Sequence, residues 1–433
     1  MAEGILRLAV IGAGPKALSA LDSLGRRLRA AGRGDGPREV RIDIVDPSER
    51  PGTGAAYDPR QPRHLRLNVT AGIVDAHEPG AEDRVVQPFR QWALEQGRDD
   101  AAEDYPPRAL IGDYLEHAWS QVAAALPERT RVRVLRGRAE QLRRPALEPR
   151  AWEVRIEPAR RAGGSGPLWH GPYDEVLLAT GHASEHPAAL EHGWVGPVPL
   201  IGGVYPASQR LSEEAVPPGS RVVVRGAALT FIDAALSLSE GRGGRFEEGS
   251  DGRLHYRPSG REPAVILPTG RSGALLDAKP DPDSAPAEAL QEGVRAEILA
   301  AGRREVLDAS DVSALLRAVQ RTAQRLLLRE RQPESEDGCG PLRSPIPEGI
   351  VAAVEETLRC GREPEQWAEL RTAAVRFERW AFGPPLRSAR RLEALVEAGI
   401  VDLSSLDAGA QIGADGRLRA PGGPSSPGPD VVV

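Results

Sequence analysis

The pattern that most constrains the fold lies in the first 46 residues. Ile5–Ile11 is a short apolar run typical of a buried strand, and it leads directly into the glycine-rich turn GAGPKA at 12–17. Apolar residues then recur at helical spacing as far as Leu28, and a second strand-like run, Val40–Val45, ends in Asp46. This order of strand, glycine turn, helix, strand and acid predicts a dinucleotide-binding unit.

The small residues of this turn each have a role in that interpretation. Gly12 permits the tight turn, Gly14 lets the backbone approach a pyrophosphate, and Ala17 lets the helix pack on the strand. The phosphates would lie beside Pro15 at the N-terminus of the following helix, where free N–H groups and the helix dipole favour anions. Asp46 would accept hydrogen bonds from an adenosine ribose. The alternative is a glycine turn of an α/β fold that binds no ligand.

A second unit of the same kind begins near residue 221. Arg221–Arg225 predicts a buried strand, and Gly226, Ala228 and Thr230 follow it at the start of an apolar helix. Ala228 stands where the fingerprint has its second glycine, and its Cβ would crowd a pyrophosphate. The unit therefore either binds a dinucleotide or is a Rossmann-like domain with weakened or absent nicotinamide binding.

Two further segments accompany these units. Glu175–Thr180 is a short apolar run that ends at Thr180 and Gly181, between the two units. Ala264–Leu267 predicts the second strand of the second unit, and Arg271 follows it where an acid would bind a ribose hydroxyl. Because arginine suits a 2′-phosphate, the second unit is predicted to bind NADP rather than NAD.

The composition excludes several classes of protein. Among 433 residues, 40% are hydrophobic and 27% are charged, which is ordinary for a globular protein. The 56 lysines and arginines against 62 acids give a net charge of −6, so a strongly basic nucleic-acid binder is not indicated. No apolar run approaches the length of a membrane span, and the first strand leaves no room for a signal peptide. We therefore expect a cytoplasmic protein with neither a nucleic-acid nor a membrane partner.

Cysteine and histidine give no sign of a metal or redox centre. Cys339 and Cys360 form no CxxC motif, and two buried thiols are the expectation. His182, His186 and His192 are irregularly spaced in a Pro-rich segment, so we predict no metal site there.

The last part of the chain changes character. A Pro/Asp-rich linker begins at residue 277, and helical patterning follows as far as about residue 380. The chain ends in Val431-Val432-Val433, which resembles the beginning of a strand that does not continue.

A set of short motifs carries a resemblance to a known family. They are GAGPKA at 12–17, PGTGAAYDP at 51–59, LRLNVTAG at 65–72, YPPRALIGDYL at 105–115, LLATGH at 177–182, GAALTFIDAAL at 226–236, YRPSGREPAVILPTGRSG at 256–273 and FGPP at 382–385. With these motifs the chain resembles the two-dinucleotide-binding-domain flavoproteins. Within them it is similar to the FAD/NAD(P)-binding group that includes flavin-dependent N-hydroxylating monooxygenases. Some of these oxidise the amine of aspartate to nitrosuccinate, and ornithine and lysine N-hydroxylases are more distant relatives.

The resemblance implies an α/β fold of two Rossmann-like dinucleotide-binding domains with a helical subdomain. Residues 1–200 would bind FAD, 201–276 would be an inserted NADP-binding domain, and 277–380 would form a helical subdomain on the substrate side. Residues 381–433 would return toward the FAD domain. Because members of the family are often longer, this last part is expected to be either naturally short or truncated.

The resemblance also nominates site residues. It places Gly52, Gly54 and Asn68 near the flavin, and Arg108 on a loop before a helix that lines the site. Each has a plainer alternative: the two glycines could form only a turn, Asn68 could satisfy a local backbone group, and Arg108 could cap or pair on the surface.

The function implied is an FAD-dependent, NADPH-consuming monooxygenase. It would use O2 to N-hydroxylate a small amine or amino acid in specialised metabolism, and an oligomer is possible. Two alternatives remain open. One is a flavin-dependent reductase or oxidase that passes electrons elsewhere, and the other is a non-catalytic nucleotide-binding protein of the same fold.

Overall fold

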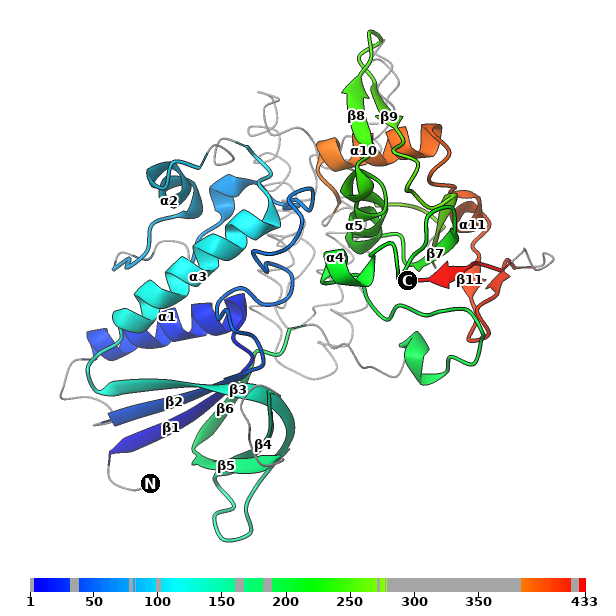
Figure 1. The fold of residues 1–433 in the computed structure, drawn as a ribbon. Helices are drawn as coiled ribbons and strands as arrows, with labels where there is room; N and C mark the ends of the chain where they lie inside the picture. Colours follow the sequence, from blue (N-terminus) through cyan, green and yellow to red (C-terminus); the bar gives the residue numbers. More distant parts are fainter. Residues whose placement is uncertain are drawn as a thin grey trace, which may run out of the picture. The chain divides into compact units, whose positions relative to one another are not determined.

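The structure is a computed structural model that describes residues 4–31, 39–77, 81, 83–98, 103–159, 167–181, 189–270, 273–276, 278, 383–421 and 428–433. The chain divides into two compact units, Met1–Ala189 and Leu190–Val433. Figure 1 colours the first unit from blue to blue-green and the second from green to red. The helical segment predicted at 277–380 lies outside the described residues, apart from Ala278.

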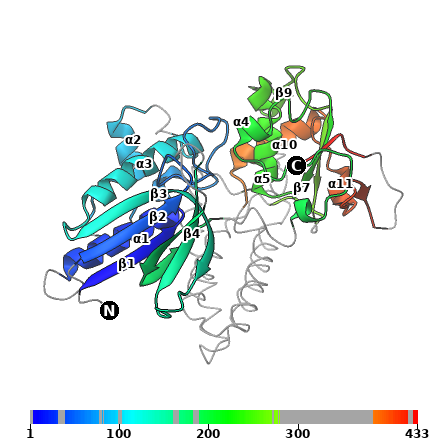
Figure 2. The same ribbon diagram turned by 60° about the horizontal axis from the view of Figure 1, so that its bottom comes forward.

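The first unit is built on a six-stranded sheet. Its strands are β1 (Ile5–Ile11), β2 (Glu39–Asp46), β3 (Thr130–Arg143), β4 (Trp152–Pro158), β5 (Leu168–Tyr173) and β6 (Glu175–Leu178). They lie in the order β5-β4-β3-β2-β1-β6. The half with the glycine turn is parallel, because β1 pairs with β2 and β6, and β2 pairs with β3. An antiparallel extension of β3, β4 and β5 curls away from it (Figure 2).

Helices cover one face of this sheet. α1 (Pro15–Ala30) and α3 (Arg108–Ala124) lie side by side over it (Figures 1 and 2). They bury apolar side chains against β-branched residues such as Ile42 and Ile44 of β2. A short 3-10 helix, η1 (Ala71–Ile73), and α2 (Phe89–Glu95) complete this layer.

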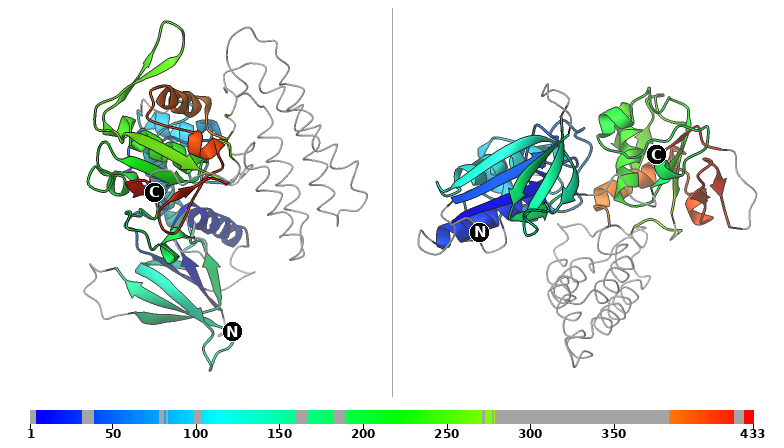
Figure 3. Two further views of the ribbon diagram at one scale, coloured as in Figure 1. Left: turned by 90° about the vertical axis from the view of Figure 1, so that its right-hand side faces the viewer. Right: turned by 90° about the horizontal axis from the view of Figure 1, so that it is seen from below.

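The second unit has a smaller parallel sheet of order β10-β7-β13. Its strands are β7 (Arg221–Arg225), β10 (Val265–Thr269) and β13 (Val431–Val432), and α5 (Leu229–Ser237) follows β7. The other elements are η4 (Leu190–His192), α4 (Ala207–Arg210), η5 (Glu240–Arg242), the hairpin β8 (Arg245–Glu248) and β9 (Leu254–Arg257), α10 (Leu386–Glu397), α11 (Ser404–Asp407), β11 (Gln411–Ile412) and β12 (Leu418–Arg419). Figure 3 shows the green β8–β9 hairpin projecting beside the orange helix α10.

The carboxyl-terminal valines correct one expectation from the sequence. They were expected to lead back toward the first unit, but β13 pairs with β7 of the second, with Val432 opposite Val223. The pairing is held at both ends: Arg221 donates its backbone N–H to Asp430 Oδ2 at 2.7 Å, and Arg225 donates its own to the Val433 carbonyl at 2.9 Å. As far as residues 381–433 are described, they pack within the second unit.

The boundary between the units also differs from the one expected at residue 200. The segment that begins at Leu190 belongs to the second unit. Trp194, Val198 and Leu200 pack against a core that contains Val223 of β7 and Leu267 of β10. Apolar packing therefore draws this segment to the second sheet.

Candidate dinucleotide sites

The first glycine turn is closed by contacts within the chain. Gly12 has φ +100° and donates its N–H to the Val45 carbonyl at 2.9 Å. A Cβ on Gly12 would lie 2.3 Å from the carbonyl oxygen of Ala179, which follows β6. Glycine at position 12 is therefore required by the fold itself.

Gly14 is a glycine for a different reason. It is the N-cap of α1 with φ −82° and ψ −171°, a conformation that any residue adopts. A Cβ there would have ordinary contact at most, since the nearest heavy atom, Gly54 Cα, would be 3.8 Å away. The chain's own packing therefore does not require glycine here. The open space at the N-terminus of α1 fits a diphosphate that approaches the backbone closely.

Asp46, at the end of β2, accepts hydrogen bonds from two backbone N–H groups. Its Oδ2 accepts the backbone N–H of Ala13 at 2.7 Å, and its Oδ1 accepts that of Ser48 at 2.7 Å. These bonds hold the glycine turn against the strand end. A carboxylate has about four acceptor positions, so this residue retains capacity for ribose hydroxyls.

The loop after β2 joins the same site. Gly52 donates its N–H to the Ala13 carbonyl at 2.6 Å, and Gly54 lies beside Gly14. Gly52 has φ +95° and a Cβ on it would be 2.6 Å from the Leu115 carbonyl of α3, so it serves packing as well. The structure thus brings the predicted residues Gly12, Gly14, Asp46, Gly52 and Gly54 together.

Other predicted residues of the first unit occupy supporting positions. Ala17 is fully buried on the sheet side of α1, and Pro15 is the first residue of that helix. Thr180 and Gly181 are exposed just beyond β6, at the carboxyl end of the parallel strands. Ligands of open α/β sheets bind at that end.

Asn68 and Arg108 lie on two segments that pair with each other. Leu67 donates its N–H to the Pro106 carbonyl at 3.0 Å, and Arg108 donates its N–H to the Leu65 carbonyl at 2.9 Å. Arg108 Nε also donates to the Arg66 carbonyl at 2.9 Å. The structure makes Arg108 the first residue of α3 rather than part of a preceding loop, and it leaves both Asn68 and Arg108 half-buried.

The second unit repeats the turn. Gly226 has φ +126° and donates its N–H to the Thr269 carbonyl at 2.9 Å, as Gly12 does to Val45. Ala228 is the N-cap of α5 with φ −96° and ψ −161°, close to the conformation of Gly14. Thr230 is exposed in the first turn of that helix.

The two turns differ at the end of the neighbouring strand. Asp46, the last residue of β2, comes directly after the Val45 carbonyl that Gly12 contacts, and Gly270 comes directly after the Thr269 carbonyl that Gly226 contacts, so the second unit has no carboxylate at this position. Arg271, which is predicted to contact a 2′-phosphate, lies outside the described residues.

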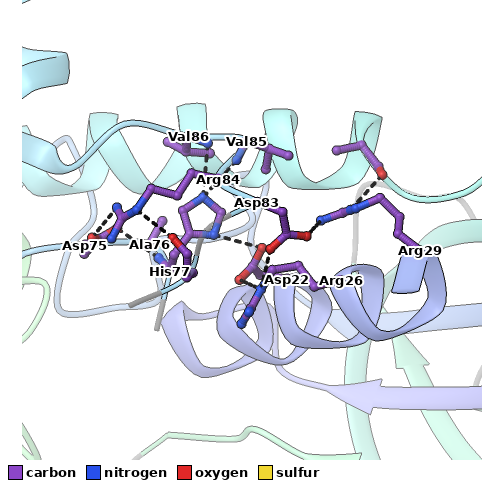
Figure 4. A network of polar contacts seen from close by, with 12 residues as sticks. Asp22, Arg26, Arg29, Asp75, Ala76, His77, Asp83, Arg84, Val85 and Val86 are labelled. Atoms are coloured by element: carbon purple, nitrogen blue, oxygen red, sulfur yellow. Dashed lines mark hydrogen bonds and ion pairs between the residues drawn. The ribbon is translucent and has the colours of Figure 1, made fainter. Parts of the chain in front are cut away.

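A buried network that the sequence analysis missed ties α1 to the segment before α2 (Figure 4). His77 Nδ1 lies 2.9 Å from Asp22 Oδ1, and both side chains are almost fully buried. His77 Nε2 accepts the backbone N–H groups of Val85 and Val86 at 3.3 and 3.1 Å. Because Nε2 accepts both N–H groups, the ring proton lies on Nδ1, the nitrogen that faces the Asp22 carboxylate. Arg26 Nε donates to the other Asp22 oxygen at 3.1 Å.

One sequence signal could have revealed this network. Asp22 falls directly after Leu21 on the buried stripe of α1, where an acid needs a partner. The partner is 55 positions away (77 − 22), so spacing along the chain could not identify it.

Within the described ranges, no group of His, Cys, Asp or Glu could hold a metal ion. His192 lies in η4, whereas His182 and His186 fall outside those ranges. Among the helices that the structure describes, none is both long and apolar enough to cross a membrane.

Comparisons with known proteins agree with this geometry. Residues 9–183 match the FAD-NAD(P)-binding family. An L-aspartate N-monooxygenase (nitrosuccinate-forming) of Streptomyces davaonensis is 31% identical over 307 residues, covering 64% of this chain and 45% of the relative. A nitrosuccinic acid synthase of Aspergillus oryzae is 29% identical over 280 residues, covering 61% of this chain and 40% of the relative.

A solved structure is also similar. The polycyclic ketone monooxygenase of Thermothelomyces thermophila matches with a TM-score of 0.39 and 15% identity, covering 99% of this chain and 62% of that one. The chain spans less than half the length of the curated relatives it matches. The predicted α/β fold and the resemblance to N-hydroxylating monooxygenases are confirmed by the family match and these relatives.

Proposed function

We propose that this chain, whose residues 9–183 match the FAD-NAD(P)-binding family, is an FAD-dependent, NADPH-consuming monooxygenase that N-hydroxylates a small amine or amino acid. The observation that carries the proposal is the first glycine turn. Among the described residues, nothing in the packing requires glycine at position 14, which is the N-cap of α1. The reaction itself is supported by the names of the relatives.

The residues of the first unit suit FAD. Gly14 and the first turn of α1 would hold the diphosphate, and Asp46 would accept the ribose hydroxyls while keeping the turn in place. Bound FAD supplies electron transfer and the activation of O2. The chain's own contribution is to position the flavin against the substrate and to exclude water.

The second unit suits a coenzyme with a phosphorylated ribose. Because position 270 is glycine, it carries no carboxylate that would repel a 2′-phosphate. Arg271, the next residue, would pair with that phosphate. This assigns NADPH to the second turn, beside Gly226, Ala228 and Thr230.

A positive site suits an amino-acid substrate. The pairing of residues 65–67 with 106–108 places Arg66 and Arg108 on neighbouring backbone segments. Because Arg66 is ion-paired with Glu103, Arg108 is the group we propose to bind a carboxylate of an acidic amino acid, the substrate class named for the L-aspartate relatives. In this assignment Arg108 orients the substrate, and Asn68 provides hydrogen bonds near the flavin.

The test compares L-aspartate with succinate, which has the same carboxylates but no amine. The purified protein should be yellow with a flavin spectrum, and L-aspartate or another small amine should increase the rate of NADPH oxidation whereas succinate should not. If added amines did not change the rate of NADPH oxidation but an added electron acceptor increased it, the reductase or oxidase alternative would be favoured. A protein that takes up no FAD would overturn both enzyme assignments.

A further inference from the structure

The two glycine turns allow a direct internal comparison. Both place a positive-φ glycine after the first strand, bonded to a carbonyl of the neighbouring strand at 2.9 Å. In both, the N-cap carbonyl accepts the first helical N–H groups: Gly14 from Ala17 at 3.0 Å, and Ala228 from Phe231 at 3.0 Å. The backbone of the two turns is therefore alike, and besides Asp46 and Gly270 at the neighbouring strand ends, the turns differ in the side chain at the N-cap.

That difference is one methyl group. Around Gly14 the space for a Cβ is open, and we assign it to the diphosphate of FAD. Ala228 has nearly the same backbone angles, so its Cβ points into the corresponding space of the second turn. Ala228 is only half-buried, so this methyl group is not enclosed by the protein.

We infer that Ala228 sets the affinity of the second turn for its coenzyme, so that NADPH exchanges readily where FAD is retained. This inference rests on the proposed function, because it requires a dinucleotide at both turns. A methyl group at the closest approach of the backbone keeps the diphosphate further from the N–H groups of α5, which weakens their hydrogen bonds. Ala228 would thereby account for the weaker binding of NADPH at the second turn compared with FAD at the first.

The neighbouring alanine provides a matched control. A Cβ added to Gly270 would lie 3.5 Å from the Cβ of Ala227, so the Ala227 methyl group lies on the β10 side of the turn. Replacing Ala227 by glycine removes the same atoms from the same turn without opening the N-cap. Glycine is also a better N-cap than alanine, so Ala228→Gly should fold normally.

The experiment measures equilibrium binding of NADP⁺ to the FAD-loaded protein by titration calorimetry, because NADP⁺ carries the same diphosphate and 2′-phosphate as NADPH but cannot reduce FAD. Ala228→Gly should lower the Kd for NADP⁺ about tenfold, the size expected when a crowded contact is relieved. Ala227→Gly should not tighten binding. Adenosine 2′-monophosphate, which lacks the diphosphate, should bind the original protein and Ala228→Gly equally well.

The outcomes separate this inference from the proposed function. Equal NADP⁺ affinity of the original protein and Ala228→Gly would overturn the role of Ala228 and leave the proposed function standing. Tightening by Ala227→Gly to the same degree would also overturn it, because the effect would then not depend on the N-cap. Absence of NADP⁺ binding to either protein, with FAD retained, would instead remove NADPH from the proposed function.

Discussion

Single residues of the first turn carry different kinds of information. Gly12 and Gly52 have positive φ, and a side chain on either would collide with a backbone carbonyl. Gly14 has an ordinary φ and room for a methyl group. The first two glycines report on the fold, and the third reports on what binds.

A substitution of Gly14 tests this distinction. Gly14→Ala should lower the affinity for FAD by about tenfold or more, because the new methyl group meets the diphosphate. It should cost at most about 1 kcal/mol of stability, the usual difference between glycine and alanine at an N-cap. Flavin titration of the apoprotein and thermal unfolding measure the two effects.

Gly12→Ala is the contrasting variant. Its Cβ would lie 2.3 Å from the Ala179 carbonyl oxygen, so it should lower the unfolding temperature of the apoprotein strongly. If Gly14→Ala lowered that temperature as much, Gly14 would be a packing residue and the ligand argument would fail.

A pH effect is expected at Glu262 of the second unit. Burial would raise the pKa of this carboxyl, but hydrogen bonds from the Ser259 N–H at 2.8 Å and the Tyr256 hydroxyl at 2.7 Å hold the pKa below its ordinary 4.5. The charged form therefore stabilises the fold above pH 4.5, and this stabilisation is lost as the pH falls through the lowered pKa.

Glu262→Gln keeps the size of the side chain and removes its charge. At pH 7 it should lower the free energy of unfolding by about 1–3 kcal/mol, as for loss of hydrogen bonds to a buried charged group. Urea unfolding at pH 7 and at pH 3.5 should show a smaller difference from the original protein in acid. A difference that stays constant or grows in acid would contradict the assignment.

Helix α1 has local features that the sequence predicts and a tertiary contact that it does not. Its start at Pro15 and its apolar stripe were predictable, since both depend on neighbouring residues in the chain. Its connection to the segment before α2 was not, because the Asp22–His77 contact joins residues far apart in sequence. Local patterns predict elements, whereas buried polar contacts depend on tertiary packing.

His77 is expected to hold that segment to α1. His77→Ala should lower the free energy of unfolding by about 1–3 kcal/mol, since it removes one of the two partners of the buried Asp22 carboxylate and leaves the Val85 and Val86 N–H groups without their acceptor. Asp22→Asn should cost less, because the amide oxygen can still accept from Nδ1–H. Chemical denaturation measures both.

An exposed ion pair serves as the control. Arg257 lies 3.0 Å from Glu247, with side chains 71% and 56% exposed, so Arg257→Ala should leave stability unchanged. A His77→Ala variant as stable as this control would show that the buried pair does not hold the segment.

For the whole molecule, repetition was the most reliable guide from sequence. Two strand–turn–helix patterns predicted two units, and the structure has a parallel sheet with a glycine turn in each. The partner of β13 was missed because two valines pair equally well with any apolar strand, and only the fold decides which. Arg271 stays a prediction, as does the role of the segment 277–380.

We propose that the chain uses FAD, NADPH and O2 to place oxygen on an amine nitrogen. The direct test is mass spectrometry of the product formed from L-aspartate under ¹⁸O2, with succinate as the control. We predict an N-oxidised product that carries ¹⁸O and depends on both FAD and NADPH. Consumption of NADPH with all the ¹⁸O recovered as hydrogen peroxide, and the amino acid unchanged, would contradict the claim.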